Sequence, residues 1–95
     1  MTMVRVNCRP VHEGWTCDVT IGDDPAATSH RVGVSTDALA SLAPGASEPT
    51  RLVEASFGFM LEREPRESIL RSFELPLIGR YFPEYADEIV RRLAQ

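Results

Sequence analysis

The 95-residue sequence contains no lysine, and all ten of its basic residues are arginine, a bias typical of a GC-rich bacterial genome. It also lacks a long hydrophobic run. No stretch approaches the roughly 18 apolar residues of a membrane span. The first ten residues carry charged and polar groups where a signal peptide needs an apolar core. We therefore expect a cytoplasmic protein that does not associate with membranes.

Glycine is also sparse, with six scattered residues. None of them forms a G-x-G-x-x-G motif or a P-loop, so a nucleotide cofactor is not indicated. The segment Gly33-Val-Ser-Thr-Asp37 does not match the G-x-S-x-G turn of serine hydrolases. The sequence does not place an acidic and a basic side chain together in a pattern that would assign them roles in catalysis. We predict no catalytic residues, no cofactor and no enzymatic activity.

The composition is that of one ordinary folded domain. Apolar residues make up 43% of the chain and charged residues 25%, and 95 residues suffice for a single modest core. The net charge of −4 disfavours general affinity for nucleic-acid phosphates, because like charges repel. Nucleic acid is therefore not the expected partner.

Apolar and polar residues alternate over two N-terminal segments, as in half-buried strands. Paired strands must place their apolar residues on one face, so Cys8 lies opposite Cys17, or diagonal to it after a slip of two residues. Gly14, in the turn between the strands, is expected to take a positive φ. The apolar members are Val4, Val6, Cys8, Trp15, Cys17, Val19 and Ile21.

A third strand is predicted over residues 28–34, where His30, Val32 and Val34 share one face. Residues 1–34 then form a three-stranded antiparallel β-meander. Its inner face is apolar and needs a cover, whereas its outer face is polar. The outer residues include Arg5, Asn7, Arg9, Thr16, Asp18 and Thr20.

Residues 35–95 are expected to supply that cover as three or four helices. Ser35 or Thr36 can cap a short first helix, and Ser47 a longer one that stops before Pro65. Short helices should follow, one bearing Ile69, Leu70 and Phe73 and another running from Pro83 to the C-terminus. The longer helix carries Leu52, Val53, Phe57, Met60 and Leu61 at helical spacing. The fold class is thus α+β, in one domain.

The cysteines and histidines include the candidate metal ligands. Cys8, Cys17 and His30 share the predicted inner face, whereas His12 lies in a turn, since four extended residues span about 13 Å. The spacing C-x3-H-x4-C-x12-H is not that of a usual zinc site. We interpret the three inner residues as core, with reduced thiols because no export signal is seen, and predict no metal.

Acidic residues cluster near the end of the longer helix, among arginines. Glu62, Glu64 and Glu67 alternate there with Arg63 and Arg66. Charges at this spacing are typical of a solvated, salt-bridged surface. We interpret the cluster in that way.

The segment Glu64-Pro-Arg-Glu-Ser-Ile-Leu70, together with Tyr81-Phe-Pro-Glu-Tyr85, resembles a recurring pattern in an uncharacterised family of small bacterial proteins. Between the two segments, the resemblance includes Phe73, Leu75 and Ile78. It covers roughly the C-terminal half of the chain, from Leu52 onward. It implies a shared fold and carries over no activity.

The aromatic segment is the candidate interaction site. Three rings within five residues cannot easily all point inward, and aromatic residues near arginine are typical of interface cores. Pro83 disfavours one continuous helix, so one tyrosine should face the core and the other the surface. The candidate interface residues are Arg80, Tyr81, Phe82 and Tyr85.

These observations leave three hypotheses about function. The first is a non-enzymatic protein-binding or regulatory module that acts on a protein partner or as a homodimer. The alternative is a DNA-binding regulator similar to ribbon-helix-helix repressors, because a strand at Arg31–Val34 precedes two helices. The third is a small enzyme or metal-binding protein.

Overall fold

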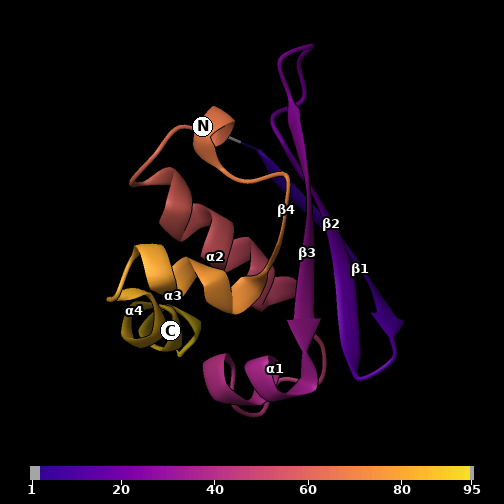
Figure 1. The fold of residues 1–95 in the computed structure, drawn as a ribbon, viewed down its shortest axis with the longest axis vertical. Coiled ribbons are helices and arrows are strands. Elements are labelled where there is room, and N and C mark those ends of the chain that lie inside the picture. Colours follow the sequence, from indigo (N-terminus) through magenta and orange to yellow (C-terminus); the bar gives the residue numbers. More distant parts are fainter. Residues whose placement is uncertain (1–2, 95) are drawn as a thin grey trace.

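The structure is a computed structural model, and it describes residues 3–94. Four strands form one sheet in the order β1-β2-β3-β4, and the helices lie on one side of it (Figure 1). The strands are β1 (Val4–Val11), β2 (Gly14–Ile21), β3 (Thr28–Ser35) and β4 (Ser72–Glu74). The α-helices are α1 (Thr36–Leu42), α2 (Thr50–Leu61), α3 (Ile78–Tyr81) and α4 (Tyr85–Leu93). Two 3₁₀ turns are η1 (Arg66–Ser68) and η2 (Leu75–Leu77).

The N-terminal meander has the predicted register. β1 and β2 pair antiparallel with Val4 opposite Ile21 and Cys8 opposite Cys17, which decides between the two registers that parity allowed. β2 and β3 are also antiparallel. The inner face is buried at Val19, Ile21 and Val32, while the outer face stays polar. The alternation in the sequence was therefore sufficient to place these three strands.

The fourth strand was not predicted, and the sheet is mixed rather than purely antiparallel. β4 pairs parallel with β3, placing Val32 opposite Phe73 and Gly33 opposite Glu74. The sequence had indicated a helix bearing Ile69, Leu70 and Phe73, but only η1 is helical there. The backbone beyond it is extended because Arg71 accepts a hydrogen bond at 2.7 Å from the Arg31 amide.

Glycine at position 33 leaves space for the Glu74 side chain of this strand on the outer face of the sheet. A Cβ built on Gly33 would lie 2.2 Å from the carboxylate of Glu74. Any larger residue would therefore displace the Glu74 side chain. A three-residue strand has too little alternation to be recognised in the sequence.

Two expected helix starts have different outcomes. Ser35 caps α1 as predicted, since its hydroxyl accepts a hydrogen bond from the Ala38 amide at 3.0 Å. Ser47 does not cap α2, which begins at Thr50 after Pro49. The side chain of Glu48 instead accepts a hydrogen bond from the Thr50 amide. The Glu48 carboxylate thus makes a hydrogen bond at the start of α2 that the sequence predicted for the Ser47 hydroxyl.

The β1–β2 turn also differs from the expectation. Glu13, not Gly14, has the positive φ, at 61°. Gly14 is needed for space, because a Cβ there would lie 2.3 Å from the carbonyl oxygen of Val34 on β3. Glutamate thus occupies a left-handed conformation that asparagine adopts more readily.

We expect Glu13→Asn to raise the free energy of unfolding by about 0.5 kcal/mol, since asparagine tolerates the left-handed region better. For a domain of this size that corresponds to a rise in Tm of about 2–4 °C. Differential scanning calorimetry measures the shift. His12→Asn, in the same turn, is the control and should leave Tm unchanged. A lower Tm for Glu13→Asn would show that the glutamate side chain contributes to the turn.

Candidate functional site

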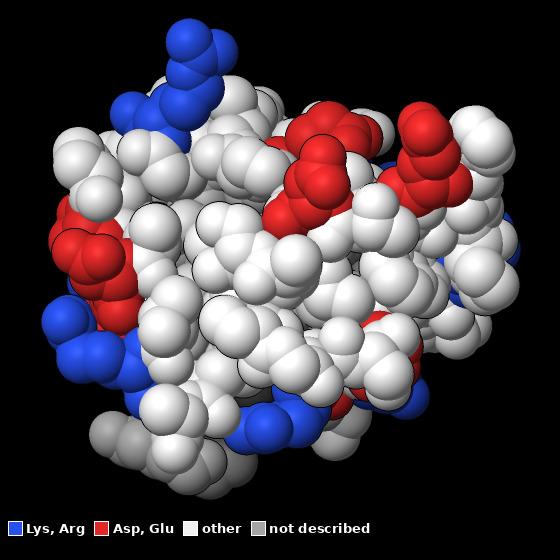
Figure 2. Space-filling model, turned by 90° about the horizontal axis from the view of Figure 1, so that it is seen from below, with Lys and Arg blue, Asp and Glu red and all other residues white. Residues whose placement is uncertain are grey.

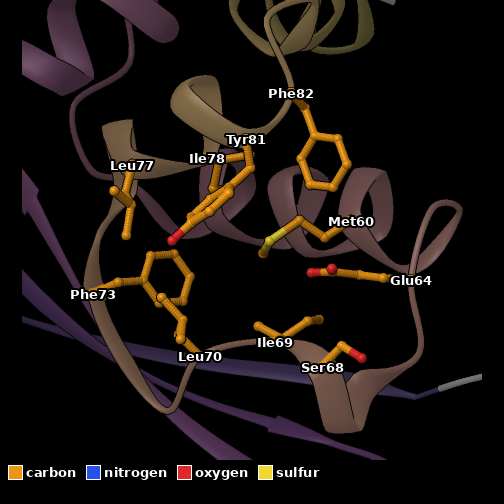
Figure 3. Close-up of a pocket in the computed structure, with 10 residues that line it drawn as sticks. All are labelled: Met60, Glu64, Ser68, Ile69, Leu70, Phe73, Leu77, Ile78, Tyr81 and Phe82. Carbon is orange, nitrogen blue, oxygen red and sulfur yellow. The ribbon is translucent and has the colours of Figure 1, made fainter.

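A groove of about 410 Å³ opens between the end of α2, the η1–β4 segment and the η2–α3 segment (Figure 3). Its floor is apolar and buried, with Met60 4%, Ile69 4% and Ile78 2% exposed. The volume is within the usual range of ligand and peptide pockets, about 300–1,000 Å³. The lining residues are Met60, Glu64, Ser68, Ile69, Leu70, Phe73, Leu77, Ile78, Tyr81 and Phe82.

Large apolar side chains stand exposed at the rim of the groove. Tyr81 is 66% exposed and Leu70 47% exposed. Both line the groove, Tyr81 from α3 above it and Leu70 from the η1–β4 segment below it in the view of Figure 3. An exposed aromatic and an exposed aliphatic residue at one concave apolar surface are typical of an interaction site.

The structure separates the four candidate interface residues. α3 ends at Tyr81 and α4 begins at Tyr85, so Pro83 lies between two helices, as its chemistry predicts. Tyr81 and Phe82 line the groove. Arg80 is exposed beside them but is not among the lining residues, and Tyr85 is buried. Two of the four residues thus belong to the groove.

Tyr85 is part of the core that supports the groove. Its hydroxyl donates a hydrogen bond of 2.6 Å to the Ser56 hydroxyl, because Ser56 itself donates to the Leu52 carbonyl at 2.7 Å. Burial raises the pKa of the Tyr85 hydroxyl to about 12. Its ring packs against Phe59, with 5.3 Å between the ring centroids. Tyr85 is therefore a structural residue that holds α4 on α2.

Ion pairs also fix the helices behind the groove. Arg92 of α4 pairs with Glu62 at the end of α2, and its hydrogen bond is the main cause that lowers the pKa of Glu62. Arg63 pairs with Glu84 at 3.1 Å, and its guanidinium lies 3.6 Å from the centroid of the Phe59 ring. These contacts tie the wall formed by α2 to the start and the end of α4.

Glu64 does not belong to a salt-bridged surface, which is how the acidic cluster was interpreted from the sequence. Glu62 and Glu67 form ion pairs, with Arg92 and Arg66 respectively. Within residues 3–94, no hydrogen bond or ion pair reaches the Glu64 carboxylate. In Figure 3 that carboxylate points into the groove, between Met60 and Ile69. Glu64 is thus a charged member of the groove lining rather than of the salt-bridged surface.

The candidate metal ligands do not form a metal site in the structure. Cys8 and Cys17 are joined by a disulfide, with their Cα atoms 4.0 Å apart, so the expectation of reduced thiols is wrong for this structure. That expectation was based on the absence of an export signal, which says nothing of the distance between the two sulfur atoms. The strand register places the two residues directly opposite, where a disulfide can form. Among residues 3–94, no three histidine, cysteine or acidic side chains are grouped as metal ligands.

His30 is a hydrogen-bonded core residue, 3% exposed. Its Nδ1 donates to the Leu70 carbonyl oxygen at 2.7 Å, and its Nε2 is hydrogen-bonded to the Thr28 hydroxyl at 2.9 Å. The ring lies 5.6 Å from that of Phe57. Both ring nitrogens are engaged, and the bond to Leu70 anchors the segment that carries one rim of the groove.

The ribbon-helix-helix alternative needs a free edge on the strand before α1. That strand is β3, which pairs with β2 on one side and β4 on the other. β4 covers this edge of β3 at residues 31–33, which belong to the strand on which the alternative rests. Asp18 on the outer face pairs with Arg9 at 2.8 Å and with Arg31 at 3.2 Å, which partly neutralises both cations.

Figure 2 shows the end of the molecule that carries α1. Acidic and basic side chains both occur around its margin, and uncharged side chains occupy its middle. The described residues visible on this face therefore form no continuous basic surface for a phosphate backbone.

Sequence reasoning missed the groove because it forms from segments with no pattern in common. Leu70 and Phe73 were assigned to a helix, and Glu64 to a charged surface. One signal was available: Ile69 and Leu70 are consecutive apolar residues, and on extended backbone they must face opposite sides. Such a pair predicts one buried and one exposed side chain.

Comparison with protein-family models, with curated proteins and with solved structures gave no match. The resemblance of the C-terminal half to a bacterial family therefore stays a prediction. Within the part of the chain that the structure describes, no helix has the length and apolar character to cross a bilayer.

Proposed function

We propose that the protein is a non-enzymatic protein-binding module, and that the groove is its binding site. The observation that carries the proposal is the pair of exposed apolar side chains, Leu70 and Tyr81, at the rim of an apolar groove. Covering such surface with a partner is favourable by about 25 cal/mol for each Å² of apolar area buried. Tyrosine is among the residues that most often dominate binding energy.

The chemistry of the lining supports binding over catalysis. Its polar groups are the Glu64 carboxylate and the hydroxyls of Ser68 and Tyr81. No hydrogen bond within the described residues 3–94 joins any two of them. A general acid and base need a defined mutual geometry, and in the described residues no hydrogen bond among these groups provides one. The apolar floor provides what a partner's side chain needs instead.

Part of the groove lining lies on elements that pack against the core, which favours a defined binding surface. Phe73 on β4 and Met60 on α2 contribute to its lining, and both elements pack against the core. Phe82 closes one side and packs edge-on against Phe59, with ring centroids 5.8 Å apart. A partner would therefore meet a largely preformed surface, which lowers the entropic cost of binding.

Tyr81→Ser should weaken partner binding by about 2 kcal/mol or more, which is roughly 30-fold in Kd. Stability should change by less than about 0.5 kcal/mol, because the ring is exposed. A peptide enriched from a displayed random 12-residue library on the wild-type protein serves as the probe. Fluorescence polarisation then measures its Kd for each variant.

Val11→Ser is the matched control for Tyr81→Ser. Val11 is 48% exposed but lies at the β1–β2 turn, and it is not among the groove-lining residues. It should leave the Kd unchanged. Enriched peptides that bind Tyr81→Ser and Leu70→Ser as tightly as the wild type would refute the groove as the site. Analytical ultracentrifugation tests whether the partner is a second copy of the chain. A dimeric wild type and a monomeric Tyr81→Ser variant would identify the protein as a homodimer that pairs through the groove.

A further inference from the structure

The position of Glu64 in the groove is held by backbone contacts at the end of α2. The amides of Arg63 and Glu64 both donate to the Met60 carbonyl at 2.9 Å, and Pro65 follows directly. Proline restricts the conformation of the residue before it. The Glu64 side chain therefore leaves a defined backbone position, and Figure 3 shows it directed into the groove.

The arginines next to Glu64 in the sequence are bound elsewhere. Arg63 donates to the carbonyl of Phe59 and pairs with Glu84. Arg66 donates to the carbonyl of Ile21 and lies 3.5 Å from the carboxylate of Asp24. Both guanidiniums are thus engaged by other groups, and among residues 3–94 no cation pairs with the Glu64 carboxylate.

A carboxylate beside an apolar floor interacts differently with charged and uncharged occupants. An uncharged apolar occupant would remove water from the carboxylate and leave the charge unpaired, which is costly. An occupant with a cation at the same place would replace that water with an ion pair. The apolar floor stabilises either occupant to a similar extent. The difference in binding free energy between the two occupants therefore comes from the carboxylate.

On the basis of the proposed function, we propose that the groove recognises a partner segment in which a large apolar side chain stands beside one lysine or arginine. The apolar side chain packs on Ile69 and Ile78, and the cation pairs with Glu64. Arg80 is exposed on α3 next to Tyr81, so a strongly basic segment would be repelled beyond the groove. One cation beside an anchor is the chemistry that fits.

The test compares two small probes that differ in the cation alone, 4-phenylbutylammonium and 4-phenylbutan-1-ol. Chemical-shift titration of the ¹⁵N-labelled full chain at pH 7 gives the Kd of each and the residues that it perturbs. We expect the ammonium probe to bind the wild type about tenfold more tightly than the alcohol. Glu64→Gln should bring the two Kd values to within about twofold, mainly by weakening the ammonium probe.

Glu67→Gln is the matched control. It removes the same charge three residues away, from a carboxylate that pairs with Arg66 and does not line the groove. It should keep the preference for the ammonium probe. Retention of the wild-type spectrum outside the groove shows that each variant is folded.

Equal binding of the two probes in the wild type would overturn this inference and leave the groove as a binding site. The same loss of preference in Glu67→Gln and Glu64→Gln would also overturn it, since long-range charge would then explain the effect. Shifts confined to residues outside the groove overturn the inference as well. The proposed function is then judged separately, by the displayed peptides and Tyr81→Ser.

Discussion

Phe57→Ala is expected to lower the free energy of unfolding by about 3–5 kcal/mol, the usual cost of deleting a buried phenylalanine ring. The side chain is 0% exposed, and its ring lies 5.6 Å from that of His30 and 6.1 Å from that of Phe73. The substitution would leave a cavity between α2 and the strands β3 and β4. Because small domains have only about 5–15 kcal/mol of stability, this is a large share of the total.

Urea denaturation followed by circular dichroism measures this loss. Glu54→Ala is the control on the same helix, since Glu54 is exposed, and it should change stability by less than about 0.5 kcal/mol. A loss below about 1 kcal/mol for Phe57→Ala would contradict the packing of α2 on the sheet. The contact with Phe73 adds a second consequence, because Phe73 also lines the groove. Any folded fraction should therefore bind groove peptides less tightly.

Reduction of the Cys8–Cys17 disulfide should lower the free energy of unfolding by about 2–3 kcal/mol. The two residues are nine apart in the sequence. Closing a loop of about ten residues removes entropy from the unfolded chain by about that amount in the loop-closure model. The folded hairpin should persist on reduction, because its register is also set by the other paired residues of β1 and β2.

The disulfide is tested by urea denaturation with and without dithiothreitol, and by the intact mass after alkylation in denaturant. The unreduced protein should take up no alkyl group. The double variant Cys8→Ala/Cys17→Ala is the control, and its stability should be insensitive to the reductant. Two alkyl groups on unreduced protein would instead support the free thiols that the sequence analysis expected.

Sequence patterns predicted the β-meander and the core because local chemistry decides both. Alternation over β1 and β2 sets which side chains are inside, and a register shift of one residue would expose all of them. Helical spacing on α2 likewise placed Leu52, Val53 and Phe57 in the core. Pro83 predicted the break between α3 and α4, since proline lacks an amide hydrogen and clashes with the preceding helical turn.

For some residues the local sequence allowed both a buried and an exposed position, and only the tertiary structure decided between them. The sequence did not decide which of Tyr81 and Tyr85 is buried, whereas in the folded chain Tyr85 is, with its hydroxyl bonded to Ser56 and its ring against Phe59. Likewise, Glu64 belonged to a run of alternating charges. Among residues 3–94 no cation pairs with it, because Arg63 and Arg66 bind groups distant in the sequence.

The sequence by itself thus determined an α+β domain whose polar-faced meander is covered by helices, since periodicity and helix breakers act within a few residues. Only the tertiary structure decided the parallel strand β4, the Cys8–Cys17 disulfide and the groove. Each of these depends on which remote segments meet. The hydrogen bonds that bring β4 to β3, from Arg31 to Arg71 and from His30 to Leu70, join residues 40 positions apart. Such contacts carry no local periodicity, because their energy is gained only when the whole chain is folded.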